Sequence, residues 1–440
     1  MELTRSLAKR RIFVGVAAAV LASAIAVFTL DTEGKADPPT PGTSVILISG
    51  DGMGVQQRTA IQYAGYGLDE RQPMDALPYA GFLDTIQDGN TAVSDSAAGA
   101  TAWSIGVKTK NGLVGLGRDK VRVPTLMEIA EAEGKATGIV NDHDITNATL
   151  ASFAAPIVNR DWKVTIAQRT LRHISPDVMM GGGEGYWYPR GDKGMIPNEV
   201  PDEDKSLGED NLVEEAIGMG YQYAYDRETV DDLTGPKALA LVQDSGLQRY
   251  KELKGYKPNE DPHYVKHPVL FAKALEILSQ DPDGFFLVTE SDDMDSAAHE
   301  HDGENVIKTG MNINKIVEIV EEFRLTHPDV LLVVTADHET GGMTIENTSE
   351  TNTNSNGDDP VPYYGDGSKN FAGPNGEVPP KSGPFEIKGT DRKFKVDWTT
   401  PEHTGGYVPV TASGPLAEEF TGVHHNTHVF DVLSQALTAD

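Results

Sequence analysis

Three apolar segments, each followed by acidic side chains, constrain the fold of this chain more than any other feature. Residues 43–49, 284–288 and 330–335 are nearly continuous runs of aliphatic and aromatic residues, a pattern typical of strands buried on both faces. Ligands bind beyond the carboxyl ends of parallel strands, so we expect the polar residues that follow these runs to converge. Those residues are Asp51, Glu290, and Asp337 with His338.

Helical segments alternate with the strands. Residues 124–133 have helical spacing and residues 137–140 predict a further strand. This alternation predicts an α/β fold, a three-layer sandwich with a central, mostly parallel sheet flanked by helices. Residues 181–268 and 347–400 lack a regular period, and we expect both to be insertions, the second an irregular, crown-like one. Residues 37–440 are expected to form a single domain carrying these two insertions.

Composition excludes several classes of site. The 67 acidic and 37 basic residues give a formal charge of −30, which speaks against a nucleic-acid-binding surface. The chain has no cysteine, so disulfides and thiolate metal sites are excluded. A transition-metal site would therefore use histidine and carboxylate ligands.

The first 36 residues resemble a targeting segment. Basic residues at positions 5 and 9–11 precede an apolar run at 12–30, which predicts an export signal of twin-arginine type. We therefore expect the protein to act in the periplasm or outside the cell. The run is also almost long enough to span a membrane, so an uncleaved anchor is the alternative, and stable membrane association would depend on it.

A second cluster of polar residues follows the strand at 284–288. Asp295 and His299 are four residues apart and would share one face of a helix, close to Glu290 at the strand end. Such a corner is a plausible metal site, and the alternative is an acidic N-cap on an exposed helix.

Ser96 is preceded by Asp95 and followed by an unbroken series of small residues. A serine at a helix start is either a cap or, with an anion at the helix N-terminus, a nucleophile. No general base is evident nearby, so activation would come from a bound metal.

Four motifs resemble those of the metal-dependent alkaline phosphatase family, in particular its bacterial secreted type. Their order and spacing agree over most of residues 43–437. They are Gly-Asp-Gly-Met-Gly at 50–54, Asp-Ser-Ala-Ala at 95–98, Thr-Ala-Asp-His at 335–338, and Glu-His-Thr-Gly at 402–405.

The resemblance implies two Zn²⁺ ions, one Mg²⁺ ion and an arginine that binds phosphate. The implied ligands are Asp295, His299 and His403 for one zinc; Asp51, Asp337, His338 and Ser96 for the other; and Asp51, Glu290 and Thr149 for magnesium. Arg160 would bind phosphate and Ser96 would be the nucleophile. The charge of the cations would exceed that of the carboxylates, which would make the pocket attractive to a phosphate dianion.

The implied activity is non-specific hydrolysis of phosphate monoesters at alkaline pH through a phosphoserine, by a homodimer with residues 347–400 as a contact region. A phosphodiesterase or sulfatase on the same scaffold is the alternative enzyme. The absence of cysteine weighs against a sulfatase, and Arg160 weighs against a diesterase. A non-catalytic, metal-stabilised secreted protein would not need Ser96 or Arg160.

Two positions depart from the family pattern. Asn147 and Ser296 are neutral where family members often carry Asp, Lys or His. We therefore expect weaker retention of phosphate and a loosely specified cation at the third site. His424, His425 and His428 precede the last predicted helix and are expected to be structural.

Overall fold

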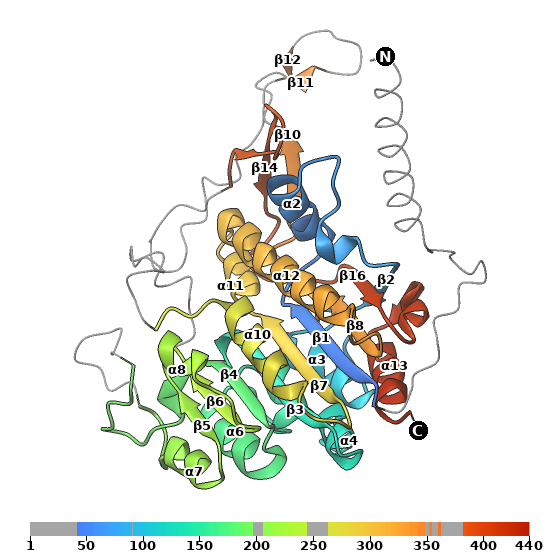
Figure 1. Cartoon of the computed structure of the whole chain (residues 1–440). Helices are drawn as coiled ribbons and strands as arrows, with labels where there is room; N and C mark the ends of the chain where they lie inside the picture. The colour runs from blue at the N-terminus through green and yellow to red at the C-terminus, as the bar shows by residue number, and fades with distance from the viewer. Residues whose placement is uncertain are drawn as a thin grey trace, which may run out of the picture. The chain divides into compact units, whose positions relative to one another are not determined.

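A central sheet organises the described part of the chain. The computed structural model describes residues 42–89, 91–196, 206–243, 263–347, 352–353, 360–361 and 382–439. The sheet has ten strands in the order β17-β2-β16-β8-β1-β7-β3-β4-β6-β5 (Figure 1). In that order the strands are Gly422–His425, Tyr79–Asp84, Val408–Ser413, Val330–Thr335, Ser44–Gly50, Phe285–Ser291, Ala136–Asp144, Val178–Gly182, Ala238–Leu241 and Gln222–Ala224.

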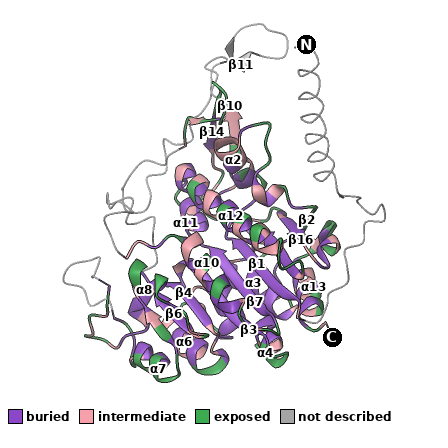
Figure 2. Cartoon of the chain, viewed as in Figure 1, coloured by how far each residue is buried: buried purple, intermediate pink, exposed green. Residues whose placement is uncertain are grey.

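The strand directions agree with the predicted α/β fold. β1 runs parallel to β7 and β8, and the parallel pairing continues through β3, β4, β6 and β5. β16 runs antiparallel to both of its neighbours, β8 and β2. Every residue of β1, β7 and β8 is buried, because helices cover both faces of the sheet here (Figure 2). The apolar runs that predicted these strands are therefore explained.

Two helical layers cover the sheet. α2, α10 and α12 lie on one face with α11, and α3, α4, α5 and α13 lie on the other (Figure 1). The first group spans Val55–Gly65, His267–Leu278, Gly303–Arg324 and Asp293–His299. The second spans Ser96–Ile105, Leu126–Ala132, Ala148–Ala154 and His428–Leu437. The predicted three-layer sandwich is confirmed.

The two predicted insertions differ in character. The described residues 206–243 include α7 (Leu212–Gly218) and α8 (Arg227–Asp231), and they add β5 and β6 to the edge of the main sheet. The second region contributes a small sheet in the order β10-β14-β13, with bounds Thr344–Asn347, Lys393–Asp397 and Phe385–Glu386. It also contributes the short pair β11 (Asn352–Thr353) and β12 (Pro360–Val361).

Some predictions lie outside the described residues. They include the export signal or anchor at 1–36 and most of the proposed dimer contact at 347–400. Among the residues that are described, we find no helix with the length and hydropathy needed to cross a membrane.

Candidate active site

The carboxyl ends of the three central strands bring buried carboxylates together. Ser49 of β1 is paired in register with Glu290 of β7 and with Thr335 of β8. Asp51 and Asp337 lie two residues beyond that level, just past the ends of the adjacent strands β1 and β8. Glu290, Asp51 and Asp337 are all at most 2% exposed. The sheet therefore places three acidic side chains at one edge.

Ser96, Asp51, Asp337 and His338 form a first set, here called the serine group. The Oγ of Ser96 lies 3.3 Å from Nε2 of His338. The same nitrogen is 3.4 Å from Oδ1 of Asp51 and 3.2 Å from Oδ2 of Asp337. Asp51, Asp337 and His338 offer ligand atoms within 4.8 Å of one another, a spacing that suits a shared cation.

Asp295, His299 and His403 form a second set, the histidine group. His299 Nε2 lies 3.2 Å from Asp295 Oδ2 and 3.1 Å from His403 Nε2, and His403 Nε2 lies 3.7 Å from Asp295 Oδ1. Nδ1 of each histidine bonds a backbone carbonyl, that of Pro401 or of Ser94. With Nδ1 as the donor, Nε2 of each imidazole in its neutral form is the nitrogen that can bind a metal.

Asp51, Thr149 and Glu290 form a third set, the oxygen group. Asp51 Oδ1, Thr149 Oγ1 and Glu290 Oε1 are buried, and none of them makes a hydrogen bond within the described chain. The other oxygen of Glu290 accepts from Asn141 Nδ2 at 2.9 Å. Buried oxygens without hydrogen bonds are rare, and these three suit a bound cation or water.

Arg160 is tied to the start of α3. A nitrogen of its guanidinium lies 3.1 Å from Oδ2 of Asp95, and Oδ1 of Asp95 accepts the N–H of Ala98 at 2.9 Å. Asp95 is thus the N-cap of α3 and also an anchor for Arg160. Burial opposes the charge of Arg160, but the carboxylate of Asp95 raises its pKa. The guanidinium is thus held as a cation against the N-cap of α3, the helix that begins at Ser96.

Without cations, the buried carboxyl groups of the site resist ionisation. Burial, followed by the charge of neighbouring carboxylates, raises the pKa values of Asp51 and Glu290 well above normal and that of Asp337 to about 7. Burial lowers the pKa of His338 well below its ordinary value. Burial also opposes the charge of His299, but Asp295 raises the pKa of this imidazole to about 9. Carboxylates packed this closely ionise together only when cations balance them.

The small residues after Ser96 allow a close helix–strand contact. A Cβ added to Gly99 would lie 2.7 Å from the backbone oxygen of Asp337 and 2.9 Å from its Cβ. The glycine therefore lets α3 approach the end of β8 and sets the spacing between Ser96 and Asp337. This contact explains the glycine at position 99.

Gly99→Ala is expected to destabilise the protein by about 1–3 kcal/mol, as overpacking does, and to lower kcat by displacing Ser96 from Asp337. Thermal unfolding and steady-state kinetics measure both effects. Gly117→Ala is the matched control, because its Cβ would meet nothing nearer than 3.6 Å. Equal behaviour of the two variants would contradict the spacing role.

Sequence reasoning missed Asp292. This residue is 4% exposed, and Asp51, Asp292 and Asp295 form another group of nearby carboxylate oxygens. The only signal was its position two residues after Glu290, in a stretch for which helix capping was the alternative to a metal site.

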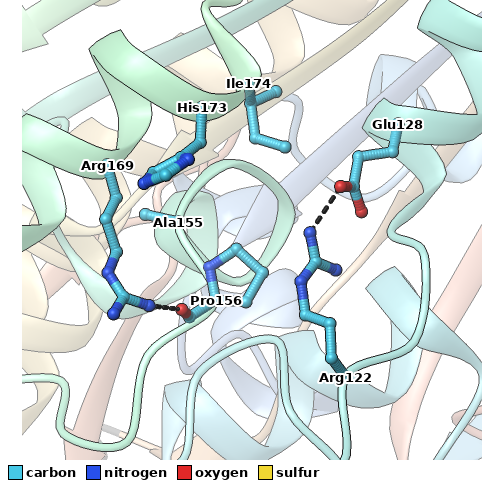
Figure 3. A pocket seen from close by; sticks show the side chains of 7 residues that line it. All are labelled: Arg122, Glu128, Ala155, Pro156, Arg169, His173 and Ile174. Carbon is cyan, nitrogen blue, oxygen red and sulfur yellow. Dashed lines mark hydrogen bonds and ion pairs between the residues drawn. The ribbon is translucent and has the colours of Figure 1, made fainter.

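Other polar features lie apart from the site. A cavity of about 320 Å³ shares no residue with the three groups. Arg122 pairs with Glu128, and Arg169 donates to the carbonyl of Pro156 (Figure 3). The C-terminal histidines, predicted to be structural, interact with one another and with their surroundings: His424 stacks on His428, and His425 pairs with Asp84.

Comparison with known proteins agrees with this geometry. The family model described as alkaline phosphatase matches residues 43–439. Alkaline phosphatase 3 of Bacillus subtilis is 28% identical, over 90% of this chain and 88% of its own length. Streptomycin-6-phosphate phosphatase of Streptomyces griseus is also 28% identical, over 95% and 96%.

Solved structures show the same fold. A cold-active alkaline phosphatase from a psychrophilic Shewanella superposes with a TM-score of 0.68 at 26% identity, covering 90% of this chain and 99% of its own. The alkaline phosphatase of Thermus thermophilus gives a TM-score of 0.71 at 20% identity, covering 94% and 96%. With a family model matched along almost the whole described fold, this chain belongs to the alkaline phosphatase family of metal-dependent phosphomonoesterases.

Proposed function

We propose that this phosphatase acts through a phosphoserine formed on Ser96, at a centre of two Zn²⁺ ions and one Mg²⁺ ion. The main support is the position of the Ser96 hydroxyl, 3.3 Å from His338 Nε2 among buried carboxylates. Asp95 supplies the N-cap of α3, so the hydroxyl of Ser96 is not needed for capping. This position suits a nucleophile and contributes no cap to the helix.

The three groups of side chains suit three cations. The histidine group offers two imidazoles and a carboxylate, a donor set typical of a zinc site that keeps an open position. The serine group offers two carboxylates, an imidazole and the hydroxyl, which fits the second zinc. The oxygen group has only hard donors, as magnesium prefers. When bound, these cations supply charge that lowers the pKa of the Ser96 hydroxyl and balances the phosphate.

The residues of the chain then divide the reaction between them. Ser96 Oγ forms a bond to phosphorus while the ester P–O bond breaks and the alcohol leaves. Water cleaves the phosphoserine in a second step, which releases phosphate and restores the hydroxyl. Arg160 donates two parallel hydrogen bonds to phosphate oxygens. Its guanidinium is oriented by Asp95, whose Oδ2 lies 3.1 Å from Nη1.

The test of this function is a substrate series. The protein is expected to hydrolyse p-nitrophenyl phosphate at alkaline pH much faster than bis(p-nitrophenyl) phosphate or p-nitrophenyl sulfate. Arg160→Lys is expected to lower kcat/KM for the monoester about 10- to 100-fold, because a lysine cannot pair with two phosphate oxygens. The diester, with fewer free oxygens, should lose less.

Arg169→Lys serves as the control, because Arg169 donates to the carbonyl of Pro156 away from the site. Faster hydrolysis of the diester or the sulfate would overturn the proposal. An equal loss for monoester and diester in Arg160→Lys would remove the assigned role of Arg160.

Export and dimerisation are part of the proposal. The basic and apolar character of residues 1–30 supports export to the periplasm or beyond. The homodimer rests on family resemblance, with residues 347–400 as the contact region. Cell fractionation and light scattering of the purified protein test the two points separately.

A further inference from the structure

Asp292 occupies a capping position without capping. It is the N-cap residue of α11, yet its side chain makes no capping hydrogen bond and its backbone is helical (φ −76°, ψ −30°). The residue is nevertheless buried, with 4% of its surface exposed. A buried carboxylate that does not serve its own helix needs another partner.

The backbone around Asp292 is held in place from β3. Oδ1 of Asp142 accepts the N–H groups of Asp292 at 2.9 Å and Asp293 at 3.1 Å. Oδ2 of Asp142 accepts the hydroxyl of Ser291 at 2.7 Å. These bonds fix the turn that follows β7 and hence the direction of the Asp292 carboxylate.

One oxygen of Asp292 is used by a chain of polar groups. Asn147 Nδ2 donates to Oδ2 of Asp292, and His143 Nδ1 lies 3.7 Å from the same oxygen. Oδ1 of Asn147 in turn accepts from Lys163 Nζ at 2.8 Å. Although Asn147 is neutral, it therefore links a cation to a carboxylate. The contacts of the Asp292 carboxylate with Asn147 and His143 are thus both made through Oδ2.

The carboxylate of Asp292 lies beside Asp51, a member of the oxygen group. Asp292, Asp51 and Asp295 offer carboxylate oxygens within 4.8 Å of one another. Each residue of the oxygen group, Asp51, Thr149 and Glu290, has a buried side-chain oxygen without a hydrogen bond among the described residues. Four oxygen donors, three of them anionic, would repel one another without a cation and suit a hard divalent ion.

We propose that Asp292 supplies a further oxygen ligand to the hard divalent cation of the oxygen group, with Lys163 and Asn147 acting as positioning residues for its carboxylate. The inference rests on the proposed function, because that function places Mg²⁺ among these oxygens. The neutral Asn147 alone led us to expect a loosely specified cation at the third site. The proposal reverses this expectation, because Asp292, in the turn after β7, supplies the negative charge that position 147 lacks. The site is then richer in carboxylate and more selective for a hard cation.

The experiment measures Mg²⁺ binding directly. Metal-free protein is loaded with two equivalents of Zn²⁺, and Mg²⁺ is titrated by calorimetry, with metal content determined on the same samples. Asp292→Asn is expected to weaken the Kd for Mg²⁺ at least tenfold and to leave zinc content unchanged. Lys163→Met should weaken it by a smaller factor, because Lys163 acts through Asn147.

Asp84→Asn is the matched control. Asp84 is another buried carboxylate at a strand end, but it pairs with Lys108 at 2.6 Å and lies on β2, outside the three groups. The Mg²⁺ affinity of the Asp84→Asn variant should stay within twofold of that of the wild type. An unchanged Mg²⁺ affinity in Asp292→Asn, or loss of zinc together with magnesium, would overturn the assignment.

A second measurement uses the wild-type protein, so it does not require a substituted protein to fold. Crystals of the wild-type protein soaked in Mn²⁺ should show an anomalous peak within coordination distance of an Asp292 oxygen, directly or through one water. A peak bound by Asp51, Thr149 and Glu290 but remote from Asp292 would overturn this inference and leave the proposed function intact. Absence of any third cation in wild-type protein would instead refute the magnesium site of the proposed function.

Discussion

Ser96→Ala is expected to abolish turnover of p-nitrophenyl phosphate, with kcat/KM falling by at least about 10⁴-fold, as loss of a catalytic nucleophile does. The variant should keep its metals, because Asp51, Asp337 and His338 remain within 4.8 Å of one another. Steady-state kinetics and metal analysis of one preparation measure both quantities. In the wild type, rapid acid quenching should trap phosphate on the protein, and in the variant it should not.

Ser104→Ala is the control for this substitution. Ser104 lies on the same helix and donates to the carbonyl of Ser152 at 2.7 Å, so its loss affects only packing and one hydrogen bond. Turnover by Ser96→Ala at a rate near that of the wild type would assign the chemistry to another nucleophile. Loss of zinc from the variant would instead show that Ser96 is needed to hold the metal.

Removal of the metals is expected to reduce activity to background and to make stability strongly dependent on pH. Asp51 and Glu290 have folded-state pKa values raised well above 3.8 and 4.5, because of burial and then of neighbouring charges. A raised acid pKa gives stability that is present at low pH and lost as pH rises. Each such group lowers the unfolding free energy by about 1.4 kcal/mol per pH unit until it ionises.

His299 acts in the same direction, because its pKa of about 9 exceeds the ordinary 6.5. The lowered pKa of His338 makes the protein more stable as pH rises, but this gain is complete once the pH exceeds the unfolded-state pKa of 6.5. Between pH 7 and pH 9 the melting temperature of the chelated protein should therefore fall. The difference between the melting temperatures of the metal-loaded and the chelated protein should increase over the same range. A gap that stays constant or narrows over this range would show that the carboxylates are not brought together in solution.

The central strands were predictable because a continuous apolar run in the sequence is enough to indicate a strand buried on both faces. Residues 43–49 and 330–335 are apolar throughout, and β1 and β8 are buried on both faces. β3 was recognised only at residues 137–140, although it spans Ala136–Asp144. Its second half is polar and yet buried, because Asn141 bonds Glu290 and Asp142 holds the turn after β7. A pattern of hydrophobicity cannot reveal a strand whose partners are other polar groups.

The active site was predictable to different degrees. Helical spacing alone placed Asp295 and His299 on one face, and their side chains lie 3.2 Å apart. His403 has no periodic relation to them, and it entered through family resemblance. Asp292 was missed because an acidic residue before a helix is usually a cap, whereas this side chain bonds Asn147 instead. Only coordinates distinguish these two uses of one carboxylate.

Asp51 has a consequence for how the centre assembles. Its carboxylate belongs to the set with Asp337 and His338 and also to the set with Asp292 and Asp295. Occupation of one position therefore changes the affinity of the next, and thermodynamic reciprocity requires the effect to be equal in both directions. The cations that share Asp51 should therefore load in a mutually dependent way, and a substitution of Asp51 itself should alter the binding of more than one of them.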